Sequence, residues 1–201
     1  MDELNTLLTV KEKDINGVLK EFNPVNCTTS KDLNIQFHYI RFQDELPRTM
    51  DFIGQLRNFI PPYCLKREKL QNITPSRITQ LYLEAKAKFV KTNTTGEPGE
   101  LIVYFLLEGY LKLPKILSKM SLKTNSQMHV HGADGVHLGF EGQDAVLHFG
   151  ESKLHSTYSS AISTALASVK EFVSPTKRNG FQTQKDFEIN ILTDEIDIPE
   201  V

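Results

Sequence analysis

The feature that most limits the fold is a pair of strand-like segments on either side of a tight-turn signal. Residues 128–140 and 145–153 are each predicted to be strands, and Glu-Gly-Gln-Asp at 141–144 is typical of a turn, so the pair predicts a β-hairpin. An apolar helix is predicted before it at 100–111, and a second helix with an apolar stripe follows at 156–173. This order predicts an α/β fold in which helices flank a mixed β-sheet.

The strongest break in the chain is a polar run at 91–99 that contains two glycines and a proline. It predicts an N-terminal α/β appendage at 1–95 and a core at 96–201. The core ends in an alternating segment at 187–192, a predicted final strand. A strand is predicted at 33–40, and helices are predicted at 51–60, where Pro61-Pro62 follow, and at 76–91. The appendage carries no recognisable chemistry, which leaves partner docking as its expected role.

Composition excludes several classes of protein. The 201 residues are 39% hydrophobic and 24% charged, as in ordinary globular proteins. Two cysteines are too few for a disulfide framework or a thiolate zinc site. The sequence contains no apolar run of ~18 residues and no readable signal peptide. We therefore expect a cytoplasmic protein with no membrane partner.

Charge is distributed unevenly along the chain. Residues 48–123 hold thirteen Lys and Arg against six Asp and Glu, although the whole chain has a net charge of −2. This permits a surface that binds a polyanion but does not demand one, because lysines often only solubilise a helix face. Seven lysines fall on or near the helices expected to border a cleft: Lys86, Lys88, Lys91, Lys112, Lys115, Lys119 and Lys123.

Three acidic residues and one lysine in the predicted core suggest a catalytic site. Side chains two apart on a strand share a face, so Glu151 and Lys153 are predicted to point the same way at the end of the second hairpin strand. Asp134 lies on the neighbouring strand, and Glu100 on the preceding helix. Two carboxylates on adjacent strands can meet at one divalent cation.

The residue types suit Mg²⁺ or Mn²⁺, which prefer oxygen ligands. Asp134, Glu151 and the backbone carbonyl of Ser152 are the predicted ligands, and Glu100 is expected to add a ligand or orient a water. Such a metal polarises a phosphoryl oxygen and activates water, while Lys153 positions that water or stabilises the developing charge. A Glu-x-Lys pair taken alone is usually just a surface ion pair.

The acid on one strand and the E-x-K on the next resemble the PD-(D/E)xK nuclease superfamily, although Ala133 replaces the proline of its motif. Three segments go further. Gly99-Glu100 lies at the start of the first core helix, His131-Gly-Ala-Asp-Gly-Val-His137 follows, and Gly150-Glu-Ser-Lys153 precedes an Ala/Ser-rich helix. Over residues 96–174 this pattern is similar to the HamA family of Hachiman anti-phage systems.

The resemblance implies metal-dependent DNA cleavage in defence against phage, under the control of HamB, a helicase-like ATPase subunit. Carried over by position, the site comprises Glu100, Asp134, Glu151 and Lys153. A different class of function stays open, in which the chain is a catalytically silent subunit that docks on the ATPase.

Five of the six histidines lie between residues 129 and 155. A zinc site at His129, His131 and His137 is the main alternative, but the sequence lacks the usual zinc-hydrolase motifs. A supporting role is expected instead for His131 or His137, as a partly cationic hydrogen-bond partner of Asp134 or of a phosphate. Purely structural histidines are an equal alternative.

Overall fold

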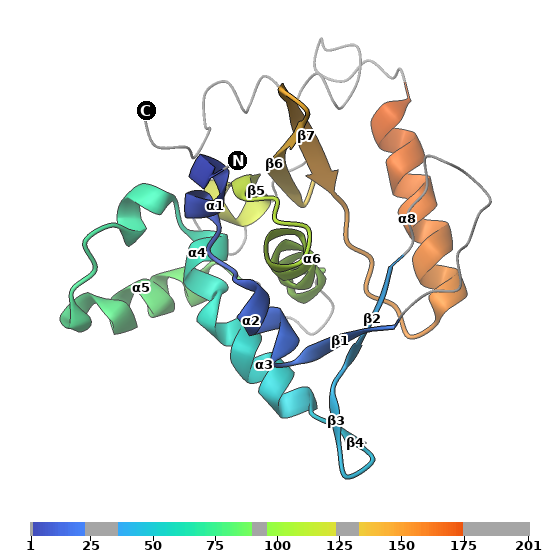
Figure 1. The fold of residues 1–201 in the computed structure, drawn as a ribbon, viewed down its shortest axis with the longest axis horizontal. Coiled ribbons are helices and arrows are strands. Elements are labelled where there is room, and N and C mark those ends of the chain that lie inside the picture. Colours follow the sequence, from blue (N-terminus) through green and yellow to red (C-terminus); the bar gives the residue numbers. More distant parts are fainter. Residues whose placement is uncertain (1, 23–35, 90–95, 124–132, 175–201) are drawn as a thin grey trace.

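The computed structural model describes residues 2–22, 36–89, 96–123 and 133–174 (Figure 1). Its first half contains the elements α1 Asp2–Leu7, α2 Glu12–Asn16, β1 Leu19–Phe22, β2 Phe37–Ile40, β3 Phe42–Gln43, β4 Leu46–Pro47, α3 Thr49–Asn58, α4 Ile60–Cys64, the 3-10 helix η1 Arg67–Leu70 and α5 Pro75–Ala87. The second half contains α6 Glu97–Gly109, β5 Lys115–Ser118, α7 Lys119–Leu122, β6 Gly135–Glu141, β7 Asp144–Gly150 and α8 Tyr158–Val173. The chain is thus a mixed α/β protein with small antiparallel sheets.

The predicted hairpin is confirmed. β6 and β7 pair antiparallel from Glu141 opposite Asp144 to Gly135 opposite Gly150, and Gly142 in the turn has a φ of 65°. Such a positive φ favours glycine, as the turn signal in the sequence requires. The described part of the chain forms one three-stranded sheet, in the order β5-β6-β7, and two two-stranded sheets, β1-β2 and β3-β4.

The strand β5 is not among the elements that the sequence predicts. α6 ends at Gly109, and the chain pairs with β6 directly after Pro114. All four residues of β5 are buried, so the alternation that identifies a half-exposed strand is missing. A strand of four residues that are all buried shows no alternation of apolar and polar residues by which it could be predicted.

Proline residues begin helices here rather than ending them. Pro61 and Pro62 lie in the first turn of α4, just after α3 has ended at Asn58. Pro98 likewise lies in the first turn of α6, which begins at Glu97, three residues before the predicted start. An early helix position tolerates proline because its missing N–H would have no partner inside the helix.

Helix α6 is the centre of the packing (Figure 1). Its residues Leu101, Tyr104 and Phe105 are buried in one hydrophobic cluster with residues from α2, α3, α4 and α5. On its other side α6 contacts β6. This hydrophobic cluster therefore contains residues from both the predicted appendage (1–95) and the predicted core (96–201). The division into two parts stays a prediction.

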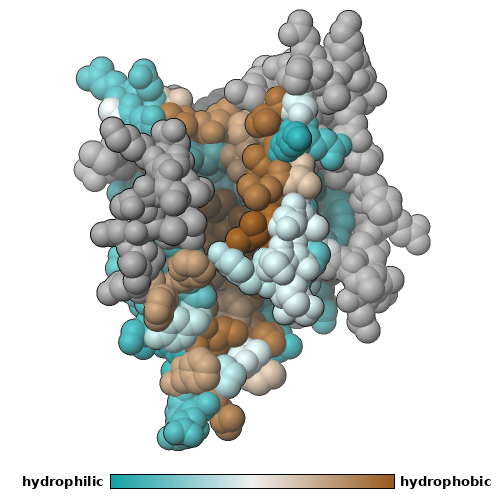
Figure 2. Space-filling view, turned by 90° about the vertical axis from the view of Figure 1, so that its right-hand side faces the viewer, coloured by the Kyte–Doolittle hydropathy of each residue, from teal (hydrophilic) through white to brown (hydrophobic). Residues whose placement is uncertain are grey.

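Helix α8 confirms the predicted helix at 156–173 but not its expected burial. None of its residues is buried, and the predicted stripe leaves Ile162, Leu166 and Val169 exposed. Its described ring contacts join Phe172 to Phe149 and Tyr158 to Phe37. Figure 2 shows hydrophobic side chains gathered on this side of the molecule. No helix among the described residues is long and apolar enough to cross a membrane.

The predicted strands at 33–40 and 128–140 are confirmed in part, as β2 and β6. Residues 33–35 and 128–132 lie outside the described residues, and β6 begins at Gly135, so Asp134 precedes the strand on which it was predicted to lie. The helix predicted at 76–91 forms as α5 but ends at Ala87. The predicted final strand at 187–192 also lies outside the described residues.

Candidate active site

Asp134 lies at the open end of the hairpin, immediately before β6. Its backbone N–H donates to the carbonyl of Gly150 at 3.0 Å, which continues the ladder by one step. Its Oδ2 accepts a hydrogen bond from the backbone N–H of Ser152 at 2.7 Å, and its Oδ1 accepts one from Lys119 Nζ at 2.8 Å. The residue is only 7% exposed, so its carboxylate is held in one place.

Glu100 reaches the same place from the first turn of α6. Glu100 and Asp134 both line a narrow crevice, together with Tyr63, Tyr104, Ser118 and His137. The Tyr63 hydroxyl donates to Glu100 Oε2 at 3.0 Å. Burial, followed by the nearby carboxylate of Asp134, raises the pKa of Glu100. The two acids predicted from separate segments are therefore electrostatically coupled neighbours.

A glycine lets the start of α6 approach the segment after β7. A Cβ added at Gly99 would lie 2.4 Å from Ser152 Oγ, which is closer than real side-chain contacts allow. A larger residue at this position would require the Ser152 hydroxyl to turn away, so glycine allows the start of α6 to contact Ser152 as the structure shows. The Gly99-Glu100 pair noted in the sequence has this steric explanation.

Glu151 and Lys153 do not lie on a strand, contrary to prediction. β7 ends at Gly150, and the residues after it have no regular structure, so the rule of alternating faces does not apply to them. Their side chains nevertheless meet in an ion pair, about a quarter exposed. Because Gly135 is opposite Gly150 in the ladder, Asp134 and Glu151 are the next residues beyond its last pair.

Lys119 is a site residue that the sequence analysis did not single out. Its ammonium donates to Asp134, and it acts at the same time on Glu100 and Glu151. Burial alone lowers the pKa of Lys119, but the carboxylate of Asp134, with help from the other two acids, outweighs it and raises the pKa. The only signal in the sequence was its place among the lysines expected near the cleft.

Lys119 belongs to the short helix α7, which is anchored at both ends. The Ser118 side chain accepts a hydrogen bond from the Ser121 N–H at 3.1 Å and caps the start of the helix. From α5, Lys88 Nζ donates to the carbonyls of Met120 and Ser121 at 3.1 and 3.2 Å. These contacts fix the segment from which Lys119 reaches Asp134.

The contact that the structure shows for His137 is a structural one, and its expected role beside Asp134 or a phosphate stays a prediction. Its ring is 1% exposed, and Nδ1 lies 2.7 Å from the carbonyl oxygen of Leu113. Burial lowers the pKa of His137 to about 4, so the ring is neutral near pH 7 and offers no positive charge to a phosphate. His131 and His129 lie outside the described residues.

The buried ring predicts how stability depends on pH. His137 takes up a proton at about 4 when folded but near 6.5 in an exposed chain, so its contribution to stability is full above pH 6.5 and is lost as the pH falls toward 4. The full shift corresponds to roughly 3 kcal/mol. Urea unfolding of the wild type and of His137→Gln between pH 7 and 4 measures it. The wild type should lose more stability than the variant, and parallel curves would contradict the assignment.

The donor set fits a hard divalent cation in its chemistry, since Glu100, Asp134 and Glu151 all offer carboxylate oxygens. Within the described ranges, however, no three acids, histidines or cysteines are grouped as a preassembled metal cluster. Ammonium groups contact two of the carboxylates: Lys119 contacts Asp134, and Lys153 contacts Glu151. Asp134, Glu151 and the Ser152 carbonyl as ligands stay a prediction.

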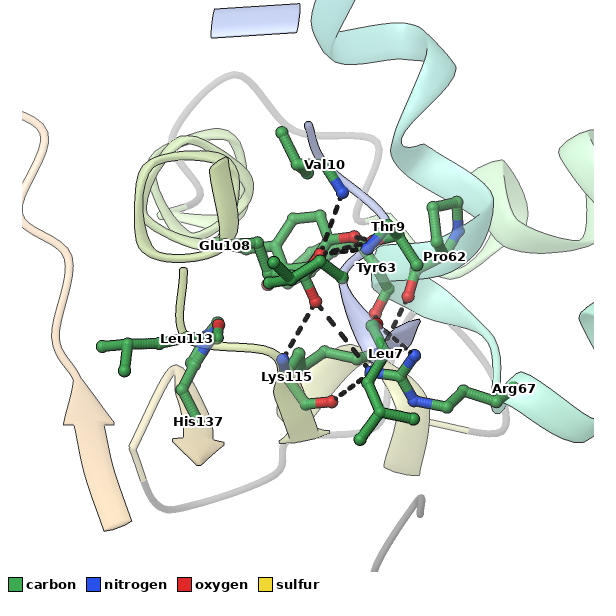
Figure 3. A network of polar contacts seen from close by, with 12 residues as sticks. Leu7, Thr9, Val10, Pro62, Tyr63, Arg67, Glu108, Leu113, Lys115 and His137 are labelled. Carbon is green, nitrogen blue, oxygen red and sulfur yellow. Dashed lines mark hydrogen bonds and ion pairs between the residues drawn. The ribbon is translucent and has the colours of Figure 1, made fainter. Parts of the chain in front are cut away.

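Figure 3 shows a buried polar cluster, which we call the Glu108 network and which shares Tyr63 and Lys115 with the lining of the crevice. Glu108 is fully buried, and its Oε2 accepts from the backbone N–H groups of Thr9 and Val10 at 2.8 and 3.0 Å. Its Oε1 accepts from the Lys115 N–H at 2.9 Å and lies 4.0 Å from the Arg67 guanidinium. The network joins both halves of the chain at α6.

Lys115 and Ser118 extend this network to the crevice that they line. Lys115 Nζ donates to the carbonyl of Pro62 at 2.7 Å, and Ser118 Oγ donates to the carbonyl of Tyr63 at 2.8 Å. These bonds hold the backbone of Tyr63, whose hydroxyl contacts Glu100. Sequence reasoning missed this arrangement because its partners are far apart in the chain.

Comparison with known protein families identifies a match over most of the chain. The family model HamA matches residues 16–200, which is nearly the whole chain. No curated protein and no solved structure matches this chain. The matched range includes α6, the β6–β7 hairpin and the segment that follows it, and so all four of the predicted catalytic residues.

Proposed function

Because this chain belongs to the HamA family, whose members act in Hachiman defence, we propose that it is a metal-dependent nuclease that hydrolyses DNA phosphodiester bonds. The observation that carries the proposal is the crevice in which Glu100 and Asp134 face one another beside Lys119. Glu100 and Asp134 line this crevice, and Lys119 contacts Asp134. This combination suits phosphoryl chemistry, since the acids can hold a cation and an ammonium group can contact phosphate. We assign the core from α6 to α8 to the PD-(D/E)xK type.

Each residue has a proposed task. Asp134, Glu151 and the Ser152 carbonyl would hold Mg²⁺ or Mn²⁺, with Glu100 as a further oxygen donor. When bound, the metal lowers the pKa of its water and polarises the phosphoryl oxygen. Lys153 would stabilise the developing negative charge on the phosphate. Tyr63 orients Glu100, because burial and the charge of Glu100 raise the pKa of Tyr63 and keep its hydroxyl a donor.

Lysines near the crevice support DNA as the substrate. The ammonium groups of Lys119 and Lys153 contact the carboxylates of Asp134 and Glu151. Lys123 forms an ion pair with Glu97 at the start of α6. A phosphate backbone would be attracted to these groups by charge, whatever its base sequence. Membership of the family implies a partner from the same system, and we propose the helicase-like ATPase HamB.

The test is a titration of Mg²⁺ or Mn²⁺ against plasmid DNA, with and without the ATPase partner. We expect the wild type to convert supercoiled plasmid to nicked or linear forms in a metal-dependent way. Lys153→Ala and Glu151→Ala should both lose this activity, because one removes the ammonium and the other a metal ligand. Exposed Lys69→Ala, which breaks only a surface ion pair with Glu84, is the matched control. Equal outcomes for all four proteins would remove the nuclease proposal.

The second candidate is a silent docking subunit. The observation in its favour is that protein donors already contact Glu100, Asp134 and Glu151 in the described structure. On this alternative the same titration gives no metal-dependent product under any condition, while the chain still binds the ATPase. Co-purification of the two subunits together with unchanged plasmid would favour it.

A further inference from the structure

We propose that Lys119 is the internal counter-cation of Asp134, and that a divalent metal binds in competition with the Lys119 ammonium and displaces it from this carboxylate. This inference rests on the proposed function, because it concerns how the same site acquires its metal. It assigns to Lys119 a competing role that is separate from the catalytic role of Lys153.

The first observation is geometric. Lys119 Nζ lies 2.8 Å from Oδ1 of Asp134, one of the proposed metal ligands. The other oxygen, Oδ2, is held by the backbone N–H of Ser152 at 2.7 Å. Each oxygen of Asp134 therefore already accepts a hydrogen bond, and a metal that binds Oδ1 competes with the ammonium for the same negative charge.

The second observation concerns charge. Three carboxylates, those of Asp134, Glu100 and Glu151, act on Lys119 together. Asp134 is 7% exposed, and like charges in so little water repel one another strongly unless a cation is present. The ammonium supplies that cation, and a divalent ion would supply more charge at the same place.

The third observation is that the backbone of α7, which carries Lys119, is held in place by several hydrogen bonds. Ser118 caps α7, and Lys88 contacts the carbonyls of Met120 and Ser121. These contacts hold the backbone of the short helix in place and keep the lysine next to Asp134 at little entropic cost. The contact thus competes with metal more effectively than a mobile surface lysine would.

The experiment compares Mn²⁺ binding by calorimetry to the full chain and its variants. Lys119→Met removes the charge and is expected to bind Mn²⁺ about tenfold tighter or more, since one unit of competing positive charge is lost. Lys119→Arg keeps the charge and should bind like the wild type. Lys123→Met is the matched control, because it removes a nearby lysine that pairs with Glu97 instead.

A second measurement uses the wild type alone and does not depend on how a variant folds. Chemical acetylation followed by mass spectrometry should label Lys119 several-fold faster when Mg²⁺ is added, because the metal releases it from Asp134. The labelling of Lys123 should not change.

Equal Mn²⁺ affinity of wild type and Lys119→Met, with no change in Lys119 labelling, would overturn the inference and leave the proposed function standing. An equal gain in Lys123→Met would also overturn it, as a general effect of charge. Failure of every variant to bind Mn²⁺ would overturn both this inference and the proposed metal chemistry.

Discussion

Replacing Glu108 by alanine is expected to lower the free energy of unfolding by about 3–5 kcal/mol. Glu108 is fully buried and accepts hydrogen bonds from the backbone of Thr9, Val10 and Lys115. Alanine would leave these buried N–H groups without their acceptor and Arg67 without its nearby carboxylate. A typical domain has ~5–15 kcal/mol of stability in total, so the loss would be severe. Urea unfolding followed by circular dichroism measures it.

The control is Glu84→Ala, which removes an exposed carboxylate that pairs with Lys69. Exposed ion pairs contribute about 1 kcal/mol at most, so this variant should unfold almost like the wild type. Similar losses for the two variants would contradict the role given to the Glu108 network. Because the network holds Lys115 and Ser118 beside the crevice, Glu108→Ala should also weaken metal binding.

Replacing Asp134 by asparagine is expected to reduce metal-dependent DNA cleavage at least ~100-fold. The exchange keeps the size of the side chain but removes the negative charge that Lys119 contacts and that we propose holds the metal. The measurement is the rate of plasmid nicking with Mg²⁺ in the presence of the ATPase partner.

Asp144→Asn is the matched control for this prediction. Asp144 lies in the same hairpin at its turn end, exposed and opposite Glu141. The same chemical change there should leave the rate within about twofold of the wild type, as surface substitutions usually do. If Asp134→Asn cleaves at the wild-type rate while remaining folded, Asp134 does not hold the metal.

Local patterns predicted the elements that carry the site, but not all of their ends. The turn at 141–144 and the strands beside it identified the β6–β7 hairpin, since turn chemistry and alternation are local properties. The end of β7 at Gly150 left no such signal, so Glu151 and Lys153 were placed on a strand that stops before them. The buried strand β5 was also missed, because it is short and does not alternate.

The sequence identified the candidate acids, and it paired Glu151 with Lys153, but it did not identify the partners of Glu100 and Asp134. Residue chemistry identified Glu100 and Asp134 as candidates, and both line one crevice. Tyr63 contacts Glu100 across 37 positions of sequence, and Lys119 contacts Asp134 across 15. Contacts of this kind depend on the packing of α4 and α7 against the rest of the chain, which no local pattern encodes.

Anomalous X-ray diffraction from crystals of the chain soaked in Mn²⁺ tests the central claim most directly. The account predicts a Mn²⁺ peak at the Asp134 carboxylate, with Glu151 or Glu100 as a second ligand and Lys119 turned away. A chain that diffracts well but shows no Mn²⁺ peak at Asp134, with Lys119 still bound to it, would contradict the account.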